Sequence, residues 1–452
     1  MPDLVVRGGT VVTPEAVRPA DVSIEGERVT AVGPELPGAT QEIDARGLLV
    51  LPAVIDAHLH FNEPGRTEWE GAATGSRALA AGGGVLFFDM PLNSTPCTVN
   101  APAFDAKCAA LRFASITDFA LWGGLVPGNR EEMAELADRG VVGFKAFLCD
   151  SGLPEFPRAD DLTLFKGMGE AARLGLPVAV HAESQELTRA RPSSSTARDF
   201  LASRPVIAEV EAIQRAALFA AETGAKLHIV HVSSGRGVVA ATEARARGAD
   251  ISIETCPHYL AFTSEDLARL GAVAKCAPPL RDAAEQNSLW GELLRGSIDL
   301  VASDHSPAPP DLKSGDFLKA WGGIAGVHST LAVLLELGHH RRGLALERIA
   351  GLLAAEPANR FRIGNRGRIA PGYSADIVLV NLAASFTLQP EDLFQRHRMS
   401  PYLATCFRGR IERTIRRGES IFFGGKITAE RGGSLVRPLP LKENHGATGP
   451  YS

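Results

Sequence analysis

Residues 54–304 repeat one pattern eight times: a short apolar run rich in β-forming residues, then a polar loop, then in most intervals a segment with helical spacing. The apolar runs are 54–60, 85–90, 116–121, 141–147, 178–181, 227–232, 251–256 and 300–304. The clearest helical segments are 70–81, 129–139, 161–174, 206–222, 235–247 and 283–295. Eight strands that alternate with helices predict a (β/α)8 TIM barrel. An open doubly wound sheet is the alternative, and the absence of Gly-x-Gly-x-x-Gly after the first strand argues against it.

Short strands broken by turns flank this repeat at both ends of the chain. Residues 1–50 contain apolar or alternating runs between Gly, Pro and Glu-Gly-Glu turns, and residues 366–435 return to that pattern. We therefore predict an α/β protein in which a barrel over residues 51–365 joins a small β-sandwich built from both flanks. Residues 436–452 contain Pro, Gly, Asn and Ser, and we expect them to form a loose tail.

The composition argues against several classes of partner. The net charge of −5 supplies no basic surface, so we expect no nucleic-acid partner. We also expect no membrane partner, because the N-terminus does not resemble a signal peptide and no apolar run approaches the roughly eighteen residues of a membrane helix. The six cysteines are scattered without a Cys-x-x-Cys pair, which is typical of reduced thiols in a cytoplasmic protein.

Polar residues stand at the ends of the predicted strands, where a (β/α)8 barrel carries its chemistry. His58 and His60 close the first run. Because residues i and i+2 share one face of a strand, the two rings should project side by side, which suits a transition-metal ion. Four later runs contribute one such residue each: Lys145, His181, His231 and Asp304.

The same spacing rule separates neighbouring polar residues. His228 and His231 are an odd number of residues apart, so we expect only His231, nearer the strand end, to face the barrel mouth. Asp304 and His305 should oppose each other for the same reason. Lys145 lies in an apolar run, where a buried amine is costly unless it is paired or modified. A lone strand histidine is usually a core residue, so the coincidence of these residues at one mouth is what indicates a metal site.

The order His-x-His, Lys, His, His, Asp on a (β/α)8 chain resembles the amidohydrolase superfamily, specifically its cyclic amidohydrolases with two bridged metal ions. Within that group the sequence is similar to the allantoinases. The matching stretches extend over nearly the whole chain: 58–71, 89–94, 143–148, 254–260, 275–281, 302–307, 319–326 and 400–402.

The resemblance implies a binuclear metal centre. His58 and His60 would bind the more buried ion together with Asp304. His181 and His231 would bind the second ion. Zinc is the expected metal for such donors, with manganese or cobalt as alternatives.

The resemblance also implies that CO2 carboxylates Lys145, so that the carbamate bridges both ions. A hydroxide between the ions would attack the ring amide, with Asp304 as the catalytic residue that accepts and returns the proton. The small-molecule substrate would be allantoin, whose five-membered hydantoin ring opens to allantoate in purine degradation. The resemblance also suggests a homotetramer.

The expected substrate contacts lie on loops, and ordinary loop structure is the alternative for each of them. These contacts are Asn93 and the backbones of Ala277, Gly322 and Gly323. Related hydantoin- and dihydropyrimidine-hydrolysing enzymes usually place a tyrosine shortly after the bridging lysine, and residues 147–152 contain none. Dihydroorotases typically carry an arginine just after the histidine pair, where this chain has Phe61 and Asn62.

Two residues depart from the usual allantoinase pattern. Asp150 stands where proline is common, and His328 stands where glutamine is common. These departures leave a hydantoinase or dihydropyrimidinase activity as an alternative. A non-catalytic scaffold relative is a third possibility, but it would have lost metal ligands, and the ligand set here is complete.

Overall fold

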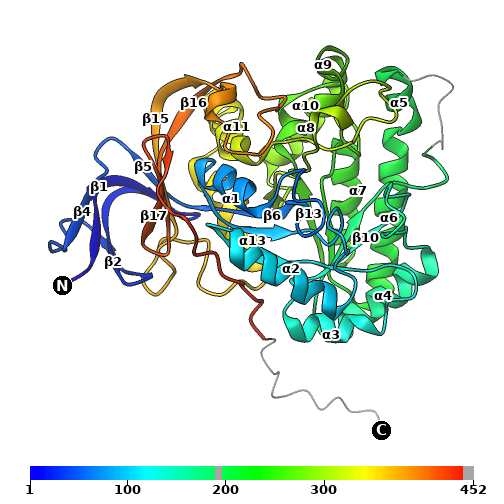
Figure 1. The fold of residues 1–452 in the computed structure, drawn as a ribbon, viewed down its shortest axis with the longest axis horizontal. Coiled ribbons are helices and arrows are strands. Elements are labelled where there is room, and N and C mark those ends of the chain that lie inside the picture. The colour runs from blue at the N-terminus through cyan, green and yellow to red at the C-terminus, as the bar shows by residue number, and fades with distance from the viewer. Residues whose placement is uncertain (189–195, 441–452) are drawn as a thin grey trace, which may run out of the picture.

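A barrel of parallel strands surrounded by helices forms the larger part of the computed structural model, which describes residues 1–188 and 196–440 (Figure 1). The strands follow one another in chain order: β6 (Val54–Leu59), β7 (Gly84–Asp89), β8 (Asp118–Leu121), β9 (Gly123–Gly124), β10 (Phe144–Phe147), β11 (Val178–His181), β12 (Leu227–Ile229), β13 (Ile251–Thr255) and β14 (Leu300–Val301). β8 and β9 flank Trp122 and occupy one barrel position, because β8 pairs with β7 and β9 pairs with β10.

The barrel closes between β6 and the segment that follows β14. Leu59 forms a parallel bridge with His305. The amide of Asp304 donates to the carbonyl of His58 at 2.9 Å, and the amide of His60 donates to the carbonyl of His305 at 2.8 Å. The predicted TIM barrel is confirmed, and its closure brings the first-strand histidines beside Asp304.

Helices cover the outside of the barrel. The longer ones are α1 (Ala72–Ala81), α2 (Ala101–Ala114), α3 (Glu132–Arg139), α4 (Asp161–Leu174), α6 (Val206–Thr223), α7 (Gly235–Ala246) and α10 (Ala283–Arg295). Shorter turns lie on the loops: α5 (Ala197–Ser203), α8 (Pro257–Ala261), α9 (Ser264–Leu270), η1 (Gly271–Ala274), η2 (Pro310–Lys313), η3 (Val327–Ser329) and η6 (Pro390–Asp392). After η3 the chain continues through α11 (Thr330–Val333), η4 (Leu334–His340), α12 (Leu346–Ala350), η5 (Gly351–Ala355) and α13 (Glu356–Arg360).

The ends of these helices follow from local sequence. In α4, the side chain of Asp160 accepts a hydrogen bond from the amide of Thr163 at the N-terminus. Gly175 ends the same helix with a φ of 68°, a left-handed conformation that suits glycine. An aspartate before the helix and a glycine after it also bound α10, at Asp282 and Gly296.

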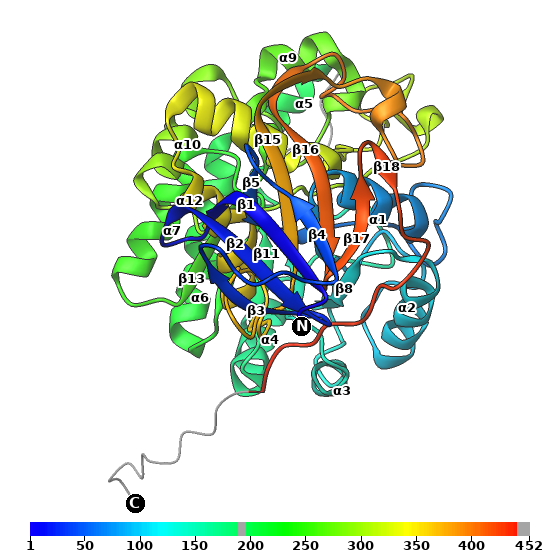
Figure 2. The same ribbon diagram turned by 90° about the vertical axis from the view of Figure 1, so that its left-hand side faces the viewer.

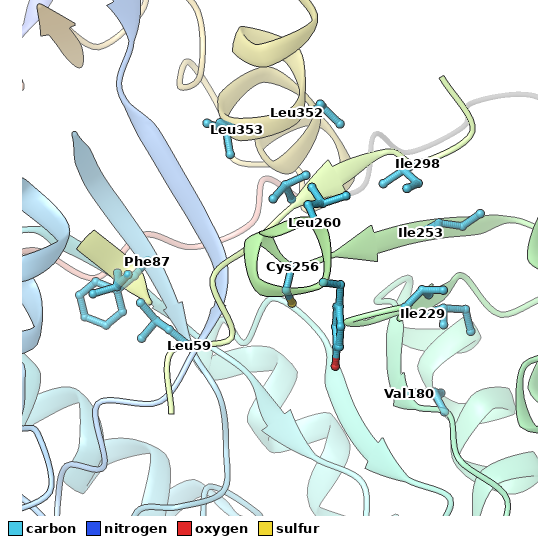
Figure 3. Packing of buried hydrophobic residues seen from close by; sticks show 14 of the residues in the cluster. Leu59, Phe87, Val180, Ile229, Ile253, Cys256, Leu260, Ile298, Leu352 and Leu353 are labelled. Atoms are coloured by element: carbon cyan, nitrogen blue, oxygen red, sulfur yellow. The ribbon is translucent and has the colours of Figure 1, made fainter. Parts of the chain in front are cut away.

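Buried apolar side chains fill the space between the strands and the helices. The barrel strands are buried on both faces, which is why their sequences are nearly continuous apolar runs. Figure 3 shows part of this core, where Leu59 and Phe87 lie together and Leu352 and Leu353 of η5 lie near the strands. Full burial of one such side chain contributes about 1.5–3 kcal/mol, so these contacts hold the strand ends in place.

A nine-stranded sheet stands beside the barrel and contains strands from both the N-terminal and the C-terminal part of the chain (Figure 2). Its strands are β1 (Leu4–Val12), β2 (Val17–Glu25), β3 (Arg28–Gly33), β4 (Gln41–Asp44), β5 (Leu49–Pro52), β15 (Ile377–Thr387), β16 (Cys406–Arg416), β17 (Glu419–Phe423) and β18 (Lys426–Ile427). β5 joins the two halves by pairing antiparallel with β15, and it leads directly into β6. The two flanks therefore share one β-layer, while the domain boundaries at residues 50 and 366 stay predictions.

The C-terminal segment lies against the barrel before the described residues end. The amide of Val436 donates to the carbonyl of Phe119 at 2.7 Å, and the amide of Leu439 donates to the carbonyl of Arg362 at 2.8 Å. The remainder of the predicted tail, residues 441–452, lies outside the described residues. Among the helices that the structure describes, none combines the length and apolar character of a membrane span.

Candidate metal centre

His58, His60 and Asp304 form a compact group where the first and last barrel strands end. His58 lies on β6, His60 follows β6, and Asp304 follows β14. The Nε2 atoms of His58 and His60 lie 3.3 and 3.5 Å from the same oxygen, Oδ1 of Asp304. Both rings are buried. Two imidazole nitrogens and a carboxylate that converge on one point form an arrangement suited to a metal ion.

The backbone at Asp304 directs its carboxylate toward the two histidines. The φ of 44° at Asp304 lies in the left-handed region, which residues other than glycine rarely adopt. Burial raises the pKa of Asp304, but His58 and His60 outweigh burial and hold the pKa well below its ordinary value. Asp304 is therefore an anion at neutral pH.

Hydrogen bonding determines which nitrogen of His58 is free. Nδ1 of His58 lies 2.7 Å from Oε1 of Glu254. Burial raises the pKa of Glu254, but His58 and His228 outweigh it and bring the pKa to about 2, so Glu254 is an ionised acceptor. Nδ1 therefore carries the hydrogen, and Nε2 presents a lone pair.

This lone pair faces a negative charge. Burial lowers the pKa of His58, so its ring is neutral at neutral pH. Its Nε2 then faces the anionic oxygen of Asp304 at 3.3 Å. Two electron-rich atoms at this separation repel each other unless a cation lies between them. This arrangement is the one expected of two ligands that share a metal ion.

His181 and His231 form a second pair, of which His181 ends β11 and His231 follows β12. Nδ1 of His181 lies 3.0 Å from Nε2 of His231. The other nitrogen of His181, Nε2, lies 2.8 Å from Oε2 of Glu183, which also forms an ion pair with Arg204. Burial raises the pKa of Glu183, but Arg204 and His181 outweigh it and bring the pKa to about 2. His181 therefore donates from Nε2 and presents the lone pair of Nδ1 to His231.

The two pairs belong to one cluster. The ring centroids of His58 and His231 lie 5.4 Å apart, and those of His181 and His231 lie 4.6 Å apart. The four histidines, which come from three barrel strands, thus meet around one space. Two cations could share it, one beside each pair.

Lys145 on β10 is fully buried within the same barrel. Its Nζ has no hydrogen-bond partner among the described residues. The amine lies 5.1 Å from the ring centroid of Phe147, which stacks on His181 with the centroids 4.4 Å apart. Burial lowers the pKa of Lys145 to about 8. An unpaired buried amine of this kind requires a partner or a modification.

The prediction that His228 and His231 face opposite ways is wrong. The His228 ring is buried inside the barrel, where its Nε2 lies 3.2 Å from Oε2 of Glu254 and its Nδ1 lies 2.8 Å from Oγ of Ser252. The strand β12 ends at Ile229, and His231 has a left-handed φ of 40°. Alternation therefore does not extend to His231, and both rings lie in the interior.

Three polar residues of this region were missed by reasoning from the sequence. Glu254 and Glu183 are fully buried carboxylates beside candidate ligands, and a charged residue within an apolar strand was the available signal for Glu254. His258 is also buried, and neither of its ring nitrogens has a partner among the described residues. It lies in a group with Cys256 and Asp304 whose potential ligand atoms are all within 4.8 Å of one another.

The predicted substrate contacts lie on three loops. Asn93 is buried and donates from Nδ2 to Oγ of Ser306 at 3.2 Å. The amide of Gly323 donates to the carbonyl of Lys275 at 2.8 Å, whereas Gly322 is exposed. Ala277, which precedes a cis proline, is partly exposed. Contact of these residues with a substrate stays a prediction.

Asp150 and His328 occupy different surroundings. Asp150 is exposed on the loop after β10, and its amide donates to Oε1 of Gln185 at 2.6 Å. His328 lines a cavity of about 590 Å³ whose other walls include Phe386 and Phe407 of the nine-stranded sheet. None of the predicted metal ligands lines this cavity. The departure at His328 therefore lies apart from the metal cluster.

Comparison with known proteins agrees with this geometry. The sequence model of the amidohydrolase family matches residues 49–421. The chain is 66% identical to an allantoinase of Solibacter usitatus over 97% of each chain, and 56% identical to an allantoinase of Rubrobacter xylanophilus over 96% of this chain and 98% of that one. Its fold is similar to that of an L-hydantoinase (dihydropyrimidinase) from Arthrobacter aurescens, with a TM-score of 0.94, 31% identity and coverage of 97% of this chain and 100% of that one.

Proposed function

The chain belongs to the amidohydrolase family, and we propose that it opens the five-membered hydantoin ring of allantoin to allantoate. The substrate follows from the allantoinases that match it over nearly its whole length. The observation that carries the chemistry is the convergence of His58 and His60 on Asp304, with lone pairs that need a cation between them. The protein is accordingly a metal-dependent hydrolase.

The donors fit two divalent cations. His58 and His60 would hold one ion together with Asp304, and His181 and His231 would hold the other. Imidazole and carboxylate donors favour zinc, with manganese and cobalt as close alternatives. When bound, the ions would polarise the scissile carbonyl and lower the pKa of a water molecule.

We propose that Lys145 becomes carboxylated. The neutral amine would attack CO2, forming a nitrogen–carbon bond and a carboxylate and releasing one proton. The fully buried position and the lack of a partner among the described residues support this reaction. With its pKa lowered to about 8, the amine is neutral in about a tenth of the molecules near pH 7. The resulting anion would offer one oxygen to each cation.

Asp304 is the proposed proton carrier. Its carboxylate stays ionised, and 13% of its side chain is exposed, so it can contact both the histidines and a molecule in the barrel mouth. Asp304 would orient the attacking water and accept its proton as the oxygen adds to the ring carbonyl. It would return that proton to the ring nitrogen as the carbon–nitrogen bond breaks.

A hydantoin or dihydropyrimidine ring is the second candidate substrate. The solved relatives that carry those names share the fold, which favours a cyclic amide of similar size. Residues 147–152 lack the tyrosine that those enzymes usually place after the bridging lysine. Allantoin is therefore the better candidate.

We further propose a homotetramer in the cytoplasm. Apolar side chains on α4 and α6 support an interface there, because Leu162, Phe165 and Leu218 are 61%, 41% and 58% exposed. Contiguous exposed apolar groups mark contact surfaces, and α4 and α6 pack against each other. Light scattering should give a mass four times that of the 47.9 kDa chain, and a mass equal to one chain would contradict the proposal.

Hydrolysis of allantoin tests the proposed function. Wild-type protein supplied with zinc and bicarbonate should convert allantoin to allantoate, detected by NMR. The matched variant Asp304→Asn keeps the size of the side chain and should lose about 10²–10⁴-fold in kcat while metal analysis still finds bound ions. Wild-type-like turnover by Asp304→Asn would overturn the role of the carboxylate. Absence of turnover by metal-loaded wild type would overturn the substrate.

A further inference from the structure

A single buried carboxylate, that of Glu254 on β13, joins histidines from two other strands. Its Oε1 accepts from Nδ1 of His58 at 2.7 Å and from the backbone amide of His231 at 3.1 Å. Its Oε2 lies 3.2 Å from Nε2 of His228. The Glu254 side chain is fully buried. One carboxylate therefore contacts a member of each candidate ligand pair.

The hydrogen on each partner can be assigned from these contacts. His58 donates from Nδ1, which leaves Nε2 free to bind a cation. Nε2 of His228 carries a hydrogen that the ionised Glu254 accepts, and Nδ1 of the same ring lies 2.8 Å from the hydroxyl oxygen of Ser252. This chain of four groups, Ser252 to His228 to Glu254 to His58, fixes the tautomer of His58 from outside the metal cluster.

The contact with His231 acts on the backbone. His231 has a φ of 40°, a strained left-handed conformation that persists only when its surroundings hold it. The Glu254 oxygen binds the amide of that residue. The conformation in turn places the His231 ring 3.0 Å from His181. Glu254 thus supports the second pair by holding the strand end from which His231 projects.

We propose that Glu254 is a positioning residue that couples the two metal positions, a role that rests on the proposed binuclear function. Through Oε1 it fixes the donor nitrogen of His58 and the backbone that carries His231. Its negative charge also makes His58 a stronger donor to a cation. Removal of the charge should weaken metal binding at both positions together. Removal of a ligand that serves one ion would weaken mainly the binding of that ion.

The variant Glu254→Gln tests this coupling, because it keeps the size of the side chain and removes the charge. Asp118→Asn is the matched control. Asp118 is also a fully buried carboxylate, but its partners are Arg366, Arg417 and the amide of Ser434, at the other end of the barrel strands. Metal-free wild type and both variants are titrated with Zn2+ in the presence of bicarbonate, with bound ions counted by elemental analysis after dialysis.

We expect two ions per chain in wild type and in Asp118→Asn, with equal affinities. In Glu254→Gln both affinities should fall by about 10–100-fold, and excess Zn2+ should restore occupancy of both positions. A second readout is spectroscopic and uses Co2+, whose absorption reports the geometry of its ligands. This absorption should change in Glu254→Gln at full occupancy. Unchanged affinities, or weakening of one position alone, would overturn the coupling.

Two further results keep the test decisive. If Glu254→Gln fails to fold, Glu254→Asp replaces it, because the charge is kept while the carboxylate is withdrawn by one methylene. It should also weaken both positions, and wild-type affinities in Glu254→Asp would overturn the inference. Wild type that binds no ion would overturn the proposed function, and the coupling with it. Wild type that binds two ions beside a Glu254 variant with unchanged affinities would overturn the coupling alone.

Discussion

Lys145→Met should make the metal-free protein more stable and the metal-loaded protein inactive. The lysine amine is fully buried, and among the described residues nothing forms a hydrogen bond with it. Methionine has a similar length and no charge. It should therefore fill the same space without the cost of burying an amine.

The magnitude follows from the pKa of Lys145. Burial lowers this pKa from 10.5 to about 8, and each pKa unit corresponds to about 1.4 kcal/mol. The charged amine therefore costs the folded state about 3 kcal/mol below pH 8. Because the unfolded chain holds its proton up to about pH 10.5, the stability of metal-free wild type should rise between these two pH values. The advantage of Lys145→Met should shrink over the same interval.

Thermal and urea unfolding of both metal-free proteins at pH 7 and pH 9.5 provide the assay. Lys145→Met should be more stable by about 1–3 kcal/mol at pH 7, which is the cost of an unsatisfied buried group. With zinc and bicarbonate the order should reverse, because ions at 1,000 times their Kd stabilise wild type by about 4 kcal/mol. A metal-free Lys145→Met protein that is less stable than wild type at pH 7 would refute the reasoning. Full turnover by this variant would refute the bridging role.

Three other predictions follow from the described contacts. Chelation should abolish turnover and lower the melting temperature, and zinc with bicarbonate should restore both; turnover that survives chelation would contradict a metal-dependent reaction. Glu336→Gln should destabilise the protein by about 1–3 kcal/mol at pH 7, because Glu336 binds Arg341 and Arg408. Burial raises the pKa of Glu336, but Arg408 outweighs it and brings the pKa to about 2, so the difference in unfolding free energy should fade as the pH drops from about 4.5 toward 2. Gly323→Ala should lower the melting temperature, since a Cβ there would lie 2.2 Å from the carbonyl oxygen of Ser306, whereas Gly322→Ala, with no atom within 4 Å, should not; equal melting temperatures would contradict this geometry.

The barrel could be predicted from the sequence because its strands are buried on both faces. The runs that contain His58, Lys145 and His181 are nearly continuous in apolar residues, and this pattern alone locates the strands. The side-by-side placement of His58 and His60 also follows from period-two geometry. Both rings do face Asp304.

The remainder of the site depends on backbone conformation and long-range contacts. Strand alternation predicts that His228 and His231 face opposite ways, but the left-handed φ of His231 ends the alternation before that residue. No local sequence signal predicts such a conformation for a histidine. Glu254 reaches His58 across 196 positions of sequence. A hydrogen bond of that kind is fixed only when the barrel closes, so spacing within one strand cannot predict it.

The most direct test of the account is turnover on a panel of cyclic amides: allantoin, hydantoin, dihydrouracil and dihydroorotate. The assay uses wild-type protein with zinc, manganese or cobalt, and with bicarbonate. We expect ring opening of allantoin well above that of the other three substrates, and dependence on the added metal. Preference for hydantoin or dihydrouracil would keep the metal centre and contradict the assigned substrate. Lack of turnover on all four, with two ions bound, would contradict the hydrolase itself.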